Sequence, residues 1–155
     1  MKVLHVFPFL SIERGGGATW LITEIAKAQS KYKTVTPTII SGDYMIDNKL
    51  VAELTKNNVN VIVSKSFFNK ISLHLMPSLI FKSYNYVKSQ DIIHFHVLRT
   101  FQNIFLFIYA IVLGKTIILD AHGSLPRHSG IKIFKKIFFD FILGKWFLKK
   151  TDLFI

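Results

Sequence analysis

Residues 2–28 read KVLHVFPFLSIERGGGATWLITEIAKA and place a glycine-dense turn between two regular elements. Lys2–Phe9 has the apolar composition of a buried strand, and Ala18–Ala28 has the pattern of a helix. The turn between them, Ser11–Gly17, contains Gly15, Gly16 and Gly17. Glycine lets backbone N–H groups approach an anion closely, and the start of a helix favours negative charge. The stretch therefore predicts an α/β unit that presents backbone donors to a phosphate, the alternative being a flexible surface turn.

The glycine spacing disfavours two common nucleotide motifs. It matches neither the G-x-G-x-x-G pattern of dinucleotide sites nor the G-x-x-x-x-G-K-[ST] pattern of P-loops. A dehydrogenase-like domain also expects an acidic residue at the end of the second strand, where Ser41-Gly42-Asp43 is the nearest approach. A dehydrogenase is therefore only a weak third interpretation.

Short runs rich in valine, isoleucine and phenylalanine alternate with longer helical patterns along the chain. Strands are expected near residues 2–9, 34–41, 59–64, 91–96, 116–121 and 152–155, and helices near 18–31, 48–57, 75–89, 100–113 and 131–149. Consecutive apolar residues within a strand are typical of a parallel sheet with helices on both faces. We predict one α/β domain over residues 1–155, a Rossmann-like doubly wound parallel sheet with its ligands beyond the carboxyl ends of the strands.

The composition limits the possible partners. The chain has 20 basic and 9 acidic residues and a formal charge of +11, which predicts attraction to nucleic acid, acidic lipid or a phosphorylated substrate. No signature of an RRM, KH, helix-turn-helix or zinc-finger module is present, so no nucleic acid partner is expected. The absence of cysteine fits a reducing compartment, and the longest apolar run, Ile104–Leu113, is too short to span a membrane. A cytoplasmic location is expected.

The main candidate for chemistry is His122, which follows the strand expected near 116–121. An imidazole there can exchange a hydrogen bond with a substrate hydroxyl, and Gly123 allows the ligand to come close. Ser124 belongs to the same polar loop, and Arg127 can pair with a phosphate or carboxylate. The alternative is that His122 only caps an ordinary loop.

A pair of histidines, His94 and His96, lies on one side of a strand because side chains alternate with a period of two. Such a pair can bind a metal ion, but a catalytic zinc takes three protein ligands and no third one is close in sequence. We therefore expect no metal, and we expect His96 to line the cleft together with Arg99 and Thr100.

The segment 132–150 mixes lysines with aromatic residues. On a helical wheel, the face expected to pack on the sheet comprises Ile133, Ile137, Phe141 and Leu148. The lysines lie opposite, and Phe138, Phe139, Leu143 and Trp146 fall among or beside them. This pattern is typical of a helix on an anionic membrane surface, or of one that faces a missing part of the protein.

Several of these stretches together resemble the amino-terminal domain of glycosyltransferase family 4, whose members are retaining enzymes with the GT-B fold. The stretches that carry the resemblance are Met1–Val6, Gly15–Gly17, Asp91–His96, Asp120–Arg127 and Thr151–Ile155, in the order of the family. The resemblance spans essentially the whole chain.

The resemblance implies two Rossmann-like domains facing across a cleft, of which this chain is the acceptor-side lobe, and a chain truncated before the donor-binding domain. The co-substrates it implies are a nucleotide-diphosphate sugar and a hydroxyl acceptor, without a metal cofactor. Gly16 and Gly17 match the glycine loop near the donor phosphate and the acceptor, and His122 matches the histidine that contacts the donor sugar near the reaction centre. His96 and Arg127 are carried over as cleft residues. The rival interpretation is a non-catalytic basic domain that docks on an anionic membrane, such as the inner face of the cell membrane, or on a partner protein.

Overall fold

The computed structural model describes residues 1–69, 74–120, 122, 137 and 140–155. Its strands are β1 (Lys2–Phe9), β2 (Thr36–Gly42), β3 (Asn60–Ser64), β4 (Ile92–His96), β5 (Thr116–Asp120) and β6 (Leu153–Phe154). Its helices are α1 (Ile12–Ser30), α2 (Asn48–Lys56), α3 (Ser78–Lys88), α4 (Phe101–Val112), the π-helical turn η2 (Asp140–Gly144) and α6 (Lys145–Lys150). Strands and helices alternate as the sequence predicts.

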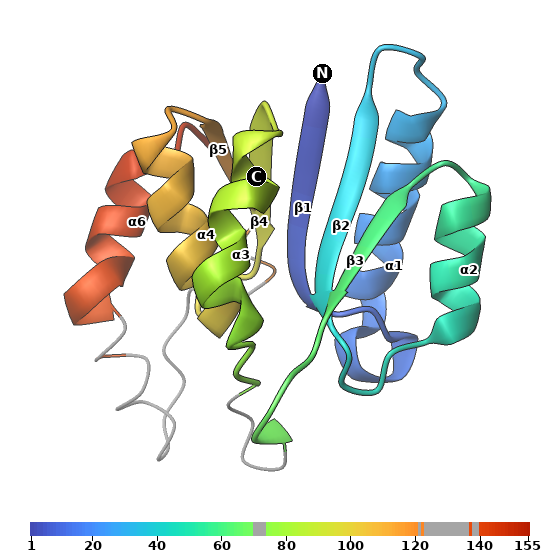
Figure 1. The fold of residues 1–155 in the computed structure, drawn as a ribbon, viewed down its shortest axis with the longest axis horizontal. Coiled ribbons are helices and arrows are strands. Elements are labelled where there is room, and N and C mark those ends of the chain that lie inside the picture. Colours follow the sequence, from blue (N-terminus) through green and yellow to red (C-terminus); the bar gives the residue numbers. More distant parts are fainter. Residues whose placement is uncertain (70–73, 121, 123–136, 138–139) are drawn as a thin grey trace.

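The six strands form one parallel sheet in the order β3-β2-β1-β4-β5-β6 (Figure 1). This is the strand order of a Rossmann-like doubly wound fold, so the predicted fold class is confirmed. The direction in which successive strands are added to the sheet reverses between β1 and β4. These two strands are neighbours in the sheet although two strands separate them in sequence. In folds of this kind a ligand crevice opens at that point, outside the carboxyl ends of the strands.

Two hydrophobic cores cover the two faces of the sheet. Leu4 and Val6 of β1 pack in the core that includes α3, α4 and α6, whereas Phe7 packs in the core that includes α1 and α2. In Figure 1, α1 and α2 lie to the right of α3, α4 and α6. Because strand side chains alternate between faces, His5 lies on the α1 side of β1 together with Phe7.

The helix after β1 starts earlier than predicted. We expected a glycine turn through Gly17 and a helix from Ala18, but α1 begins at Ile12 and contains the glycines. The Ser11 hydroxyl caps it by accepting a hydrogen bond from the Arg14 backbone N–H at 3.3 Å. At Gly16 the backbone leaves helical geometry (φ 56°, ψ −137°), so the helix is kinked there. Within the predicted turn, the structure thus departs from helical geometry after Ile12 only at Gly16.

The predicted packing face of the last helical segment is only partly right: Leu148 packs against the core as expected, but two other members do not. Ile137 and Phe141 are 43% and 84% exposed, whereas Phe147 is buried and stacks on Phe107 with 3.7 Å between ring centroids. The π-helical turn η2 bears on the position of Phe147: a π-helix holds more residues per turn than an α-helix, so it rotates the residues that follow around the helix axis. Residues 132–136 and 138–139 lie outside the described residues.

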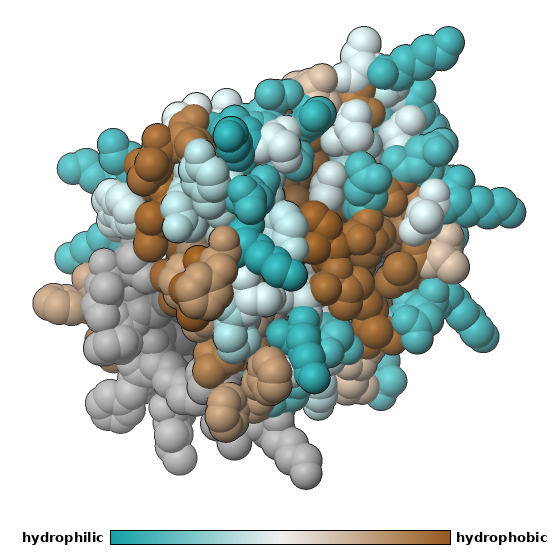
Figure 2. Space-filling view, viewed as in Figure 1, coloured by the Kyte–Doolittle hydropathy of each residue, from teal (hydrophilic) through white to brown (hydrophobic). Residues whose placement is uncertain are grey.

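The outer surface mixes charged and apolar residues. Figure 2 shows hydrophobic residues gathered over the region of β3, an edge strand whose Val63 is 43% exposed, with hydrophilic residues around them. None of the helices in the described part of the chain is long and apolar enough to cross a bilayer.

Candidate functional site

Strained backbone gathers at the carboxyl edge of the sheet. Among the described residues, six non-glycine residues have a positive φ angle. Five of these six follow the carboxyl ends of strands, namely Met45, Phe68, His74, Val97 and His122, and the sixth, Asn58, lies between α2 and β3. The φ angle of Val97 is 84°, which a β-branched residue rarely adopts. Because backbone strain collects at ligand sites, this edge is the candidate functional site.

The neighbouring strands β1, β4 and β5 bring the predicted residues to this edge. The glycine segment follows β1, Arg99 follows β4, and His122 follows β5. Gly16 and Gly17 are exposed there. Gly123, Ser124 and Arg127 lie outside the described residues, so their place relative to this edge stays a prediction.

The three glycines have different physical roles. A Cβ atom at Gly15 would lie 2.0 Å from Thr19 Oγ1 and 3.1 Å from the Phe7 ring, so Gly15 is required by packing. Gly16 and Gly17 have nothing within 4 Å of such an atom, so a ligand can approach both of them. Gly16 alone has the positive φ angle that forms the kink.

Replacing Gly16 with alanine is expected to lower the free energy of unfolding by ~1–3 kcal/mol, because alanine rarely adopts its backbone angles and no steric clash adds to the cost. Gly17→Ala is the matched control. It is expected to be neutral or to stabilise the chain by ~0.5–1 kcal/mol, because alanine favours the helix. Urea denaturation of both variants checks this, and equal effects at the two positions would contradict the assigned kink.

A chain of hydrogen bonds runs through the histidines. His5 Nε2 lies 2.8 Å from Gln29 Oε1, and His5 Nδ1 lies 3.0 Å from His96 Nε2. His96 Nδ1 lies 3.2 Å from His122 Nε2, which is also 3.3 Å from Asp120 Oδ2. The structure thus connects His96 and His122, two of the predicted site residues, and it extends the connection to the buried interior.

Strand register explains how these side chains meet. His5 of β1 is the register partner of His94 in β4, and His96 is the register partner of Asp120 in β5. His94 and His96 lie on the same face of β4 because they are two residues apart. Parallel pairing therefore places imidazoles from two strands and a carboxylate from a third on one face of the sheet.

Burial keeps the inner imidazoles neutral. It lowers the pKa of His5 to about 4, against the raising effect of the hydrogen bond to Gln29. It also lowers the pKa of His94 to about 3, and the nearby His5 and His122 contribute to this lowering. The pKa of His96 is lowered as well, first by burial and then by the neighbouring histidines. His94 Nε2 is buried without a hydrogen-bond partner among the described residues.

Arg99 pairs with an acidic residue of η2. Its Nε and Nη2 atoms each lie 2.8 Å from an oxygen of Asp140, in the paired geometry that a guanidinium and a carboxylate prefer. The two side chains are only 11% and 12% exposed. The positive charge of this predicted binding residue is therefore offset inside the chain, so Arg99 shapes the edge rather than offering a bare cation.

Among the described residues, two sets of side chains are close enough to share a metal ion. They are His5, His94 and His96, and His96, Asp120 and His122, each with ligand atoms within 4.8 Å of one another. A third ligand, which is not close in sequence to His94 and His96, is thus supplied by neighbouring strands. The first set is buried and has no carboxylate to offset the charge of a divalent ion. The second has a donor set that suits zinc or iron, but its two rings are already hydrogen-bonded to each other, and His122 Nε2 lies 3.3 Å from Asp120 Oδ2.

Sequence reasoning missed four residues of this arrangement: His5, Gln29, Asp120 and Asp140. A signal existed for His5, since an imidazole inside an otherwise apolar buried strand needs a polar partner. Asp140 lies 41 residues from Arg99, and Gln29 lies 24 residues from His5, so no local spacing relates them.

A second group at the same edge also went unpredicted. The His74 ring lies 4.8 Å from the Phe9 ring and 5.2 Å from the Tyr44 ring, centroid to centroid. The Arg14 guanidinium lies 5.5 Å from the Phe9 ring centroid, a cation–π distance. Burial and the Arg14 charge lower the pKa of His74. This group provides aromatic surface beside the glycine segment.

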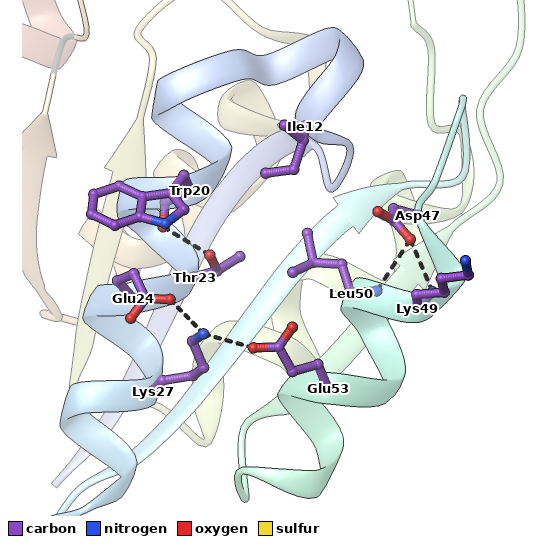
Figure 3. A pocket seen from close by; sticks show the side chains of 9 residues that line it. All are labelled: Ile12, Trp20, Thr23, Glu24, Lys27, Asp47, Lys49, Leu50 and Glu53. Carbon is purple, nitrogen blue, oxygen red and sulfur yellow. Dashed lines mark hydrogen bonds and ion pairs between the residues drawn. The ribbon is translucent and has the colours of Figure 1, made fainter.

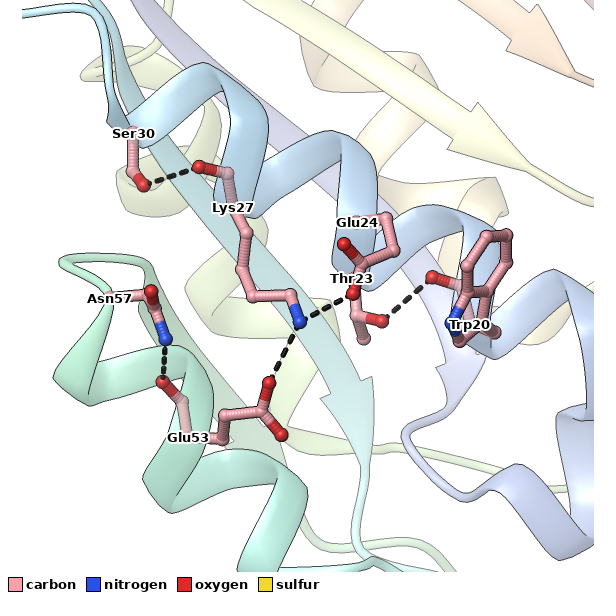
Figure 4. A network of polar contacts seen from close by, with 7 residues as sticks. All are labelled: Trp20, Thr23, Glu24, Lys27, Ser30, Glu53 and Asn57. Atoms are coloured by element: carbon pink, nitrogen blue, oxygen red, sulfur yellow. Dashed lines mark hydrogen bonds and ion pairs between the residues drawn. The ribbon is translucent and has the colours of Figure 1, made fainter.

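A groove of about 320 Å³ lies elsewhere, between α1 and α2 (Figure 3). Lys27 pairs there with Glu24 and, at 2.7 Å, with Glu53 (Figure 4). Asp47 accepts hydrogen bonds from the Lys49 and Leu50 amides at 2.9 and 3.2 Å, so it caps α2. Only the Lys27–Glu53 pair among these contacts joins α1 to α2, and the groove is not the candidate site.

Comparison with known proteins assigns no family. No model of a known protein family matches the chain, and no curated protein matches its sequence. The function is therefore inferred from the geometry of the carboxyl edge and from the motifs of the sequence.

Proposed function

We propose that this chain is the acceptor-side, amino-terminal domain of a retaining glycosyltransferase resembling family 4, one lobe of a GT-B fold. The observation that supports it most is the position of His122. This residue follows β5 at the carboxyl edge of the sheet, and its backbone is strained (φ 40°). Its ring is hydrogen-bonded to His96. An imidazole held in this way suits the orientation of a polyhydroxylated ligand.

The proposed reaction moves a glycosyl group from a nucleotide-diphosphate sugar to an acceptor hydroxyl. The bond from the anomeric carbon to the phosphate oxygen breaks, the bond to the acceptor oxygen forms on the same face, and the leaving phosphate takes the acceptor proton. His122 orients the sugar, while the backbone at Gly16 and Gly17 approaches the diphosphate. No metal takes part in this scheme.

The magnitudes require a second domain. A helix terminus contributes ~0.3–2 kcal/mol towards an anion, whereas enzymes lower barriers by ~8–23 kcal/mol. The glycine segment alone falls far short of that, so we infer that a donor-binding domain supplies most of the electrostatic stabilisation. By itself, this chain is expected to be inactive.

The dehydrogenase alternative loses support from the contacts of Asp43. Its Oδ1 accepts hydrogen bonds from the Ser66 backbone N–H at 2.8 Å and from the Ser66 hydroxyl at 2.6 Å. The nearest acidic residue to the end of β2 is thus engaged with the segment after β3, where it is not poised to receive a ribose hydroxyl.

A specific observation favours a second candidate role, docking on an anionic membrane. Phe141 and Trp146 are 84% and 38% exposed, and Lys145, Lys149 and Lys150 are exposed around them. Exposed aromatics among lysines suit the headgroup region of an acidic bilayer. We propose that the protein works in the cytoplasm at the inner membrane face. Sedimentation with vesicles checks this, and equal binding to acidic and neutral lipid would rule it out.

A transfer assay tests the main proposal. The chain is joined to a domain that binds nucleotide-diphosphate sugars, and turnover is compared for the parent and for His122→Ala. We expect kcat to fall by ~100-fold or more, in the range found when a positioned catalytic side chain is removed. Lys33→Ala, an exposed residue before β2 at the opposite edge, is the control and should keep full activity. Unchanged turnover of His122→Ala, or a product with inverted anomeric configuration, would contradict the proposal.

A further inference from the structure

We propose that the hydrogen-bond chain from Gln29 through His5 and His96 is directional and fixes His122 in the tautomer that carries its proton on Nε2. The Nδ1 lone pair of His122 is then the nitrogen left to accept a hydrogen bond from a ligand hydroxyl. Gln29, His5, His96 and Asp120 are positioning residues in this scheme. Only the identity of that hydroxyl, on a sugar, rests on the proposed function.

The inner rings each carry one ring proton. His5 and His96 are fully buried, and burial favours their neutral form. A neutral imidazole donates from one nitrogen and accepts at the other. Both nitrogens of His5 and both nitrogens of His96 have partners in the chain, so the proton position in one ring determines that in the next.

The outer end sets the direction. His122 Nε2 lies 3.3 Å from Asp120 Oδ2, and a carboxylate only accepts hydrogen bonds. A lone pair on His122 Nε2 would face that negative charge, so this nitrogen carries hydrogen, which it donates to His96 Nδ1 at 3.2 Å. With its Nδ1 accepting, His96 must donate from Nε2 to His5 Nδ1, and His5 must donate from Nε2.

The inner end agrees with this direction. His5 Nε2 lies 2.8 Å from the side-chain oxygen of Gln29, which accepts. The two ends are independent of each other, because one is a carboxylate after β5 and the other an amide on α1. Because both ends require the same direction, every contact along the chain joins one donor to one acceptor.

The backbone holds the outer ring in the same place. The His122 backbone N–H donates to Asp120 Oδ1 at 3.3 Å, so Asp120 contacts both the backbone and the ring of His122. The His122 ring also stacks on the His96 ring, with 5.4 Å between centroids and 15° between planes. Since Nε2 is engaged on this inner side, Nδ1 is the nitrogen available to a ligand.

Nitrogen-15 NMR of the full chain, labelled at histidine, reads these tautomers directly without any sugar or transfer activity. At pH 7.5 we expect His5, His96 and His122 to carry a proton on Nε2, with His5 and His96 lacking one on Nδ1. A neutral ring protonated on Nδ1 at any of the three positions would overturn the proposal. The measurement needs no variant, so it stays decisive where a substitution prevents folding.

Variants test the part played by Asp120. Asp120→Asn introduces an amide that can donate, so we expect a several-fold rise in the fraction of His122 protonated on Nδ1. Asp47→Asn, at the carboxylate that caps α2, is the matched control and should leave every ring unchanged. Tautomers that stay unchanged in a folded Asp120→Asn protein would overturn the role of Asp120.

Zinc ions provide a further check. A zinc ion shared by His96 and His122 would need a lone pair on His122 Nε2, whereas in the proposed tautomer that nitrogen carries a proton. Under the proposal, one equivalent of zinc sulfate leaves the ring nitrogen signals unchanged. A stoichiometric shift of the His96 and His122 nitrogens would instead show a metal site and overturn the relay. Failure of the transfer assay would leave the tautomer result intact, so the two proposals fail separately.

Discussion

At pH 5 the chain is expected to be ~6 kcal/mol less stable to unfolding than at pH 7.5, because three buried imidazoles bind protons only after unfolding. Burial lowers the folded pKa of His5 to about 4 and that of His94 to about 3, and it lowers the pKa of His96 as well. In the unfolded chain each histidine titrates near its ordinary value of ~6.5. At pH 5 this difference costs ~2 kcal/mol for each ring. The total is comparable to the whole stability of a typical domain.

The sign follows from proton counting. At pH 7.5 these rings are almost entirely neutral in both the folded and the unfolded chain, so the penalty is negligible. Between pH 6.5 and about 4 the unfolded chain binds more protons, and stability falls as the pH falls through that window. Below the folded pKa of His5, its penalty no longer grows, whereas that of His94 continues towards pH 3.

Urea denaturation at pH 7.5, 6 and 5 measures this dependence. His94→Leu is the matched control, since His94 Nε2 has no hydrogen-bond partner to lose among the described residues. This variant keeps two of the three rings, so its loss at pH 5 should be ~4 kcal/mol. A stability that stays flat from pH 7.5 to 5 would contradict the neutral, buried state of the cluster.

The second large effect is expected from the Arg99–Asp140 pair. Arg99→Met leaves the Asp140 carboxylate in a largely buried position without the guanidinium that pairs with it. Breaking a buried pair from one side costs ~3–5 kcal/mol, which thermal or urea denaturation detects easily. Because Asp140 begins η2, we expect the contact of Phe147 with Phe107 to loosen as well.

Two further variants separate charge from packing. Arg99→Met combined with Asp140→Leu removes both charges and is expected to recover much of the stability, because neither member of the pair is left buried without the other. Lys27→Met breaks exposed ion pairs with Glu24 and Glu53 and should cost at most ~1 kcal/mol. A double variant no more stable than Arg99→Met alone would contradict the charge-based explanation.

The regular elements could be predicted because their signals are local. Apolar runs such as Ile117–Leu119 and turn residues mark the strands, and the observed strands begin and end within two residues of the expected positions for all six. Helix starts were harder: α1 begins at Ile12 because Ser11 caps it, and the glycines interrupt that helix only at Gly16. A run of three glycines alone does not reveal which of them takes the positive φ angle.

The last segment shows a different limit. A helical wheel assumes 3.6 residues per turn, and the π-helical turn η2 breaks that assumption just before α6. Phe141, inside this turn, is exposed, and Phe147, after it, is buried. No pattern within the segment predicts the π-helical turn. Asp140, its first residue, pairs with Arg99, which lies 41 positions away in the sequence.

By itself the sequence determined the parallel α/β architecture, the placement of Gly16 and His122 at strand ends, and the strong positive charge, since these depend on composition and on neighbours along the chain. Only the tertiary structure decided that His5, His96, Asp120 and His122 form one hydrogen-bonded group, and that Arg99 is paired. The reason is that strand order and register place residues on three different strands within hydrogen-bond distance. Pairing between distant segments of this kind depends on the packed core, which no single stretch of sequence contains.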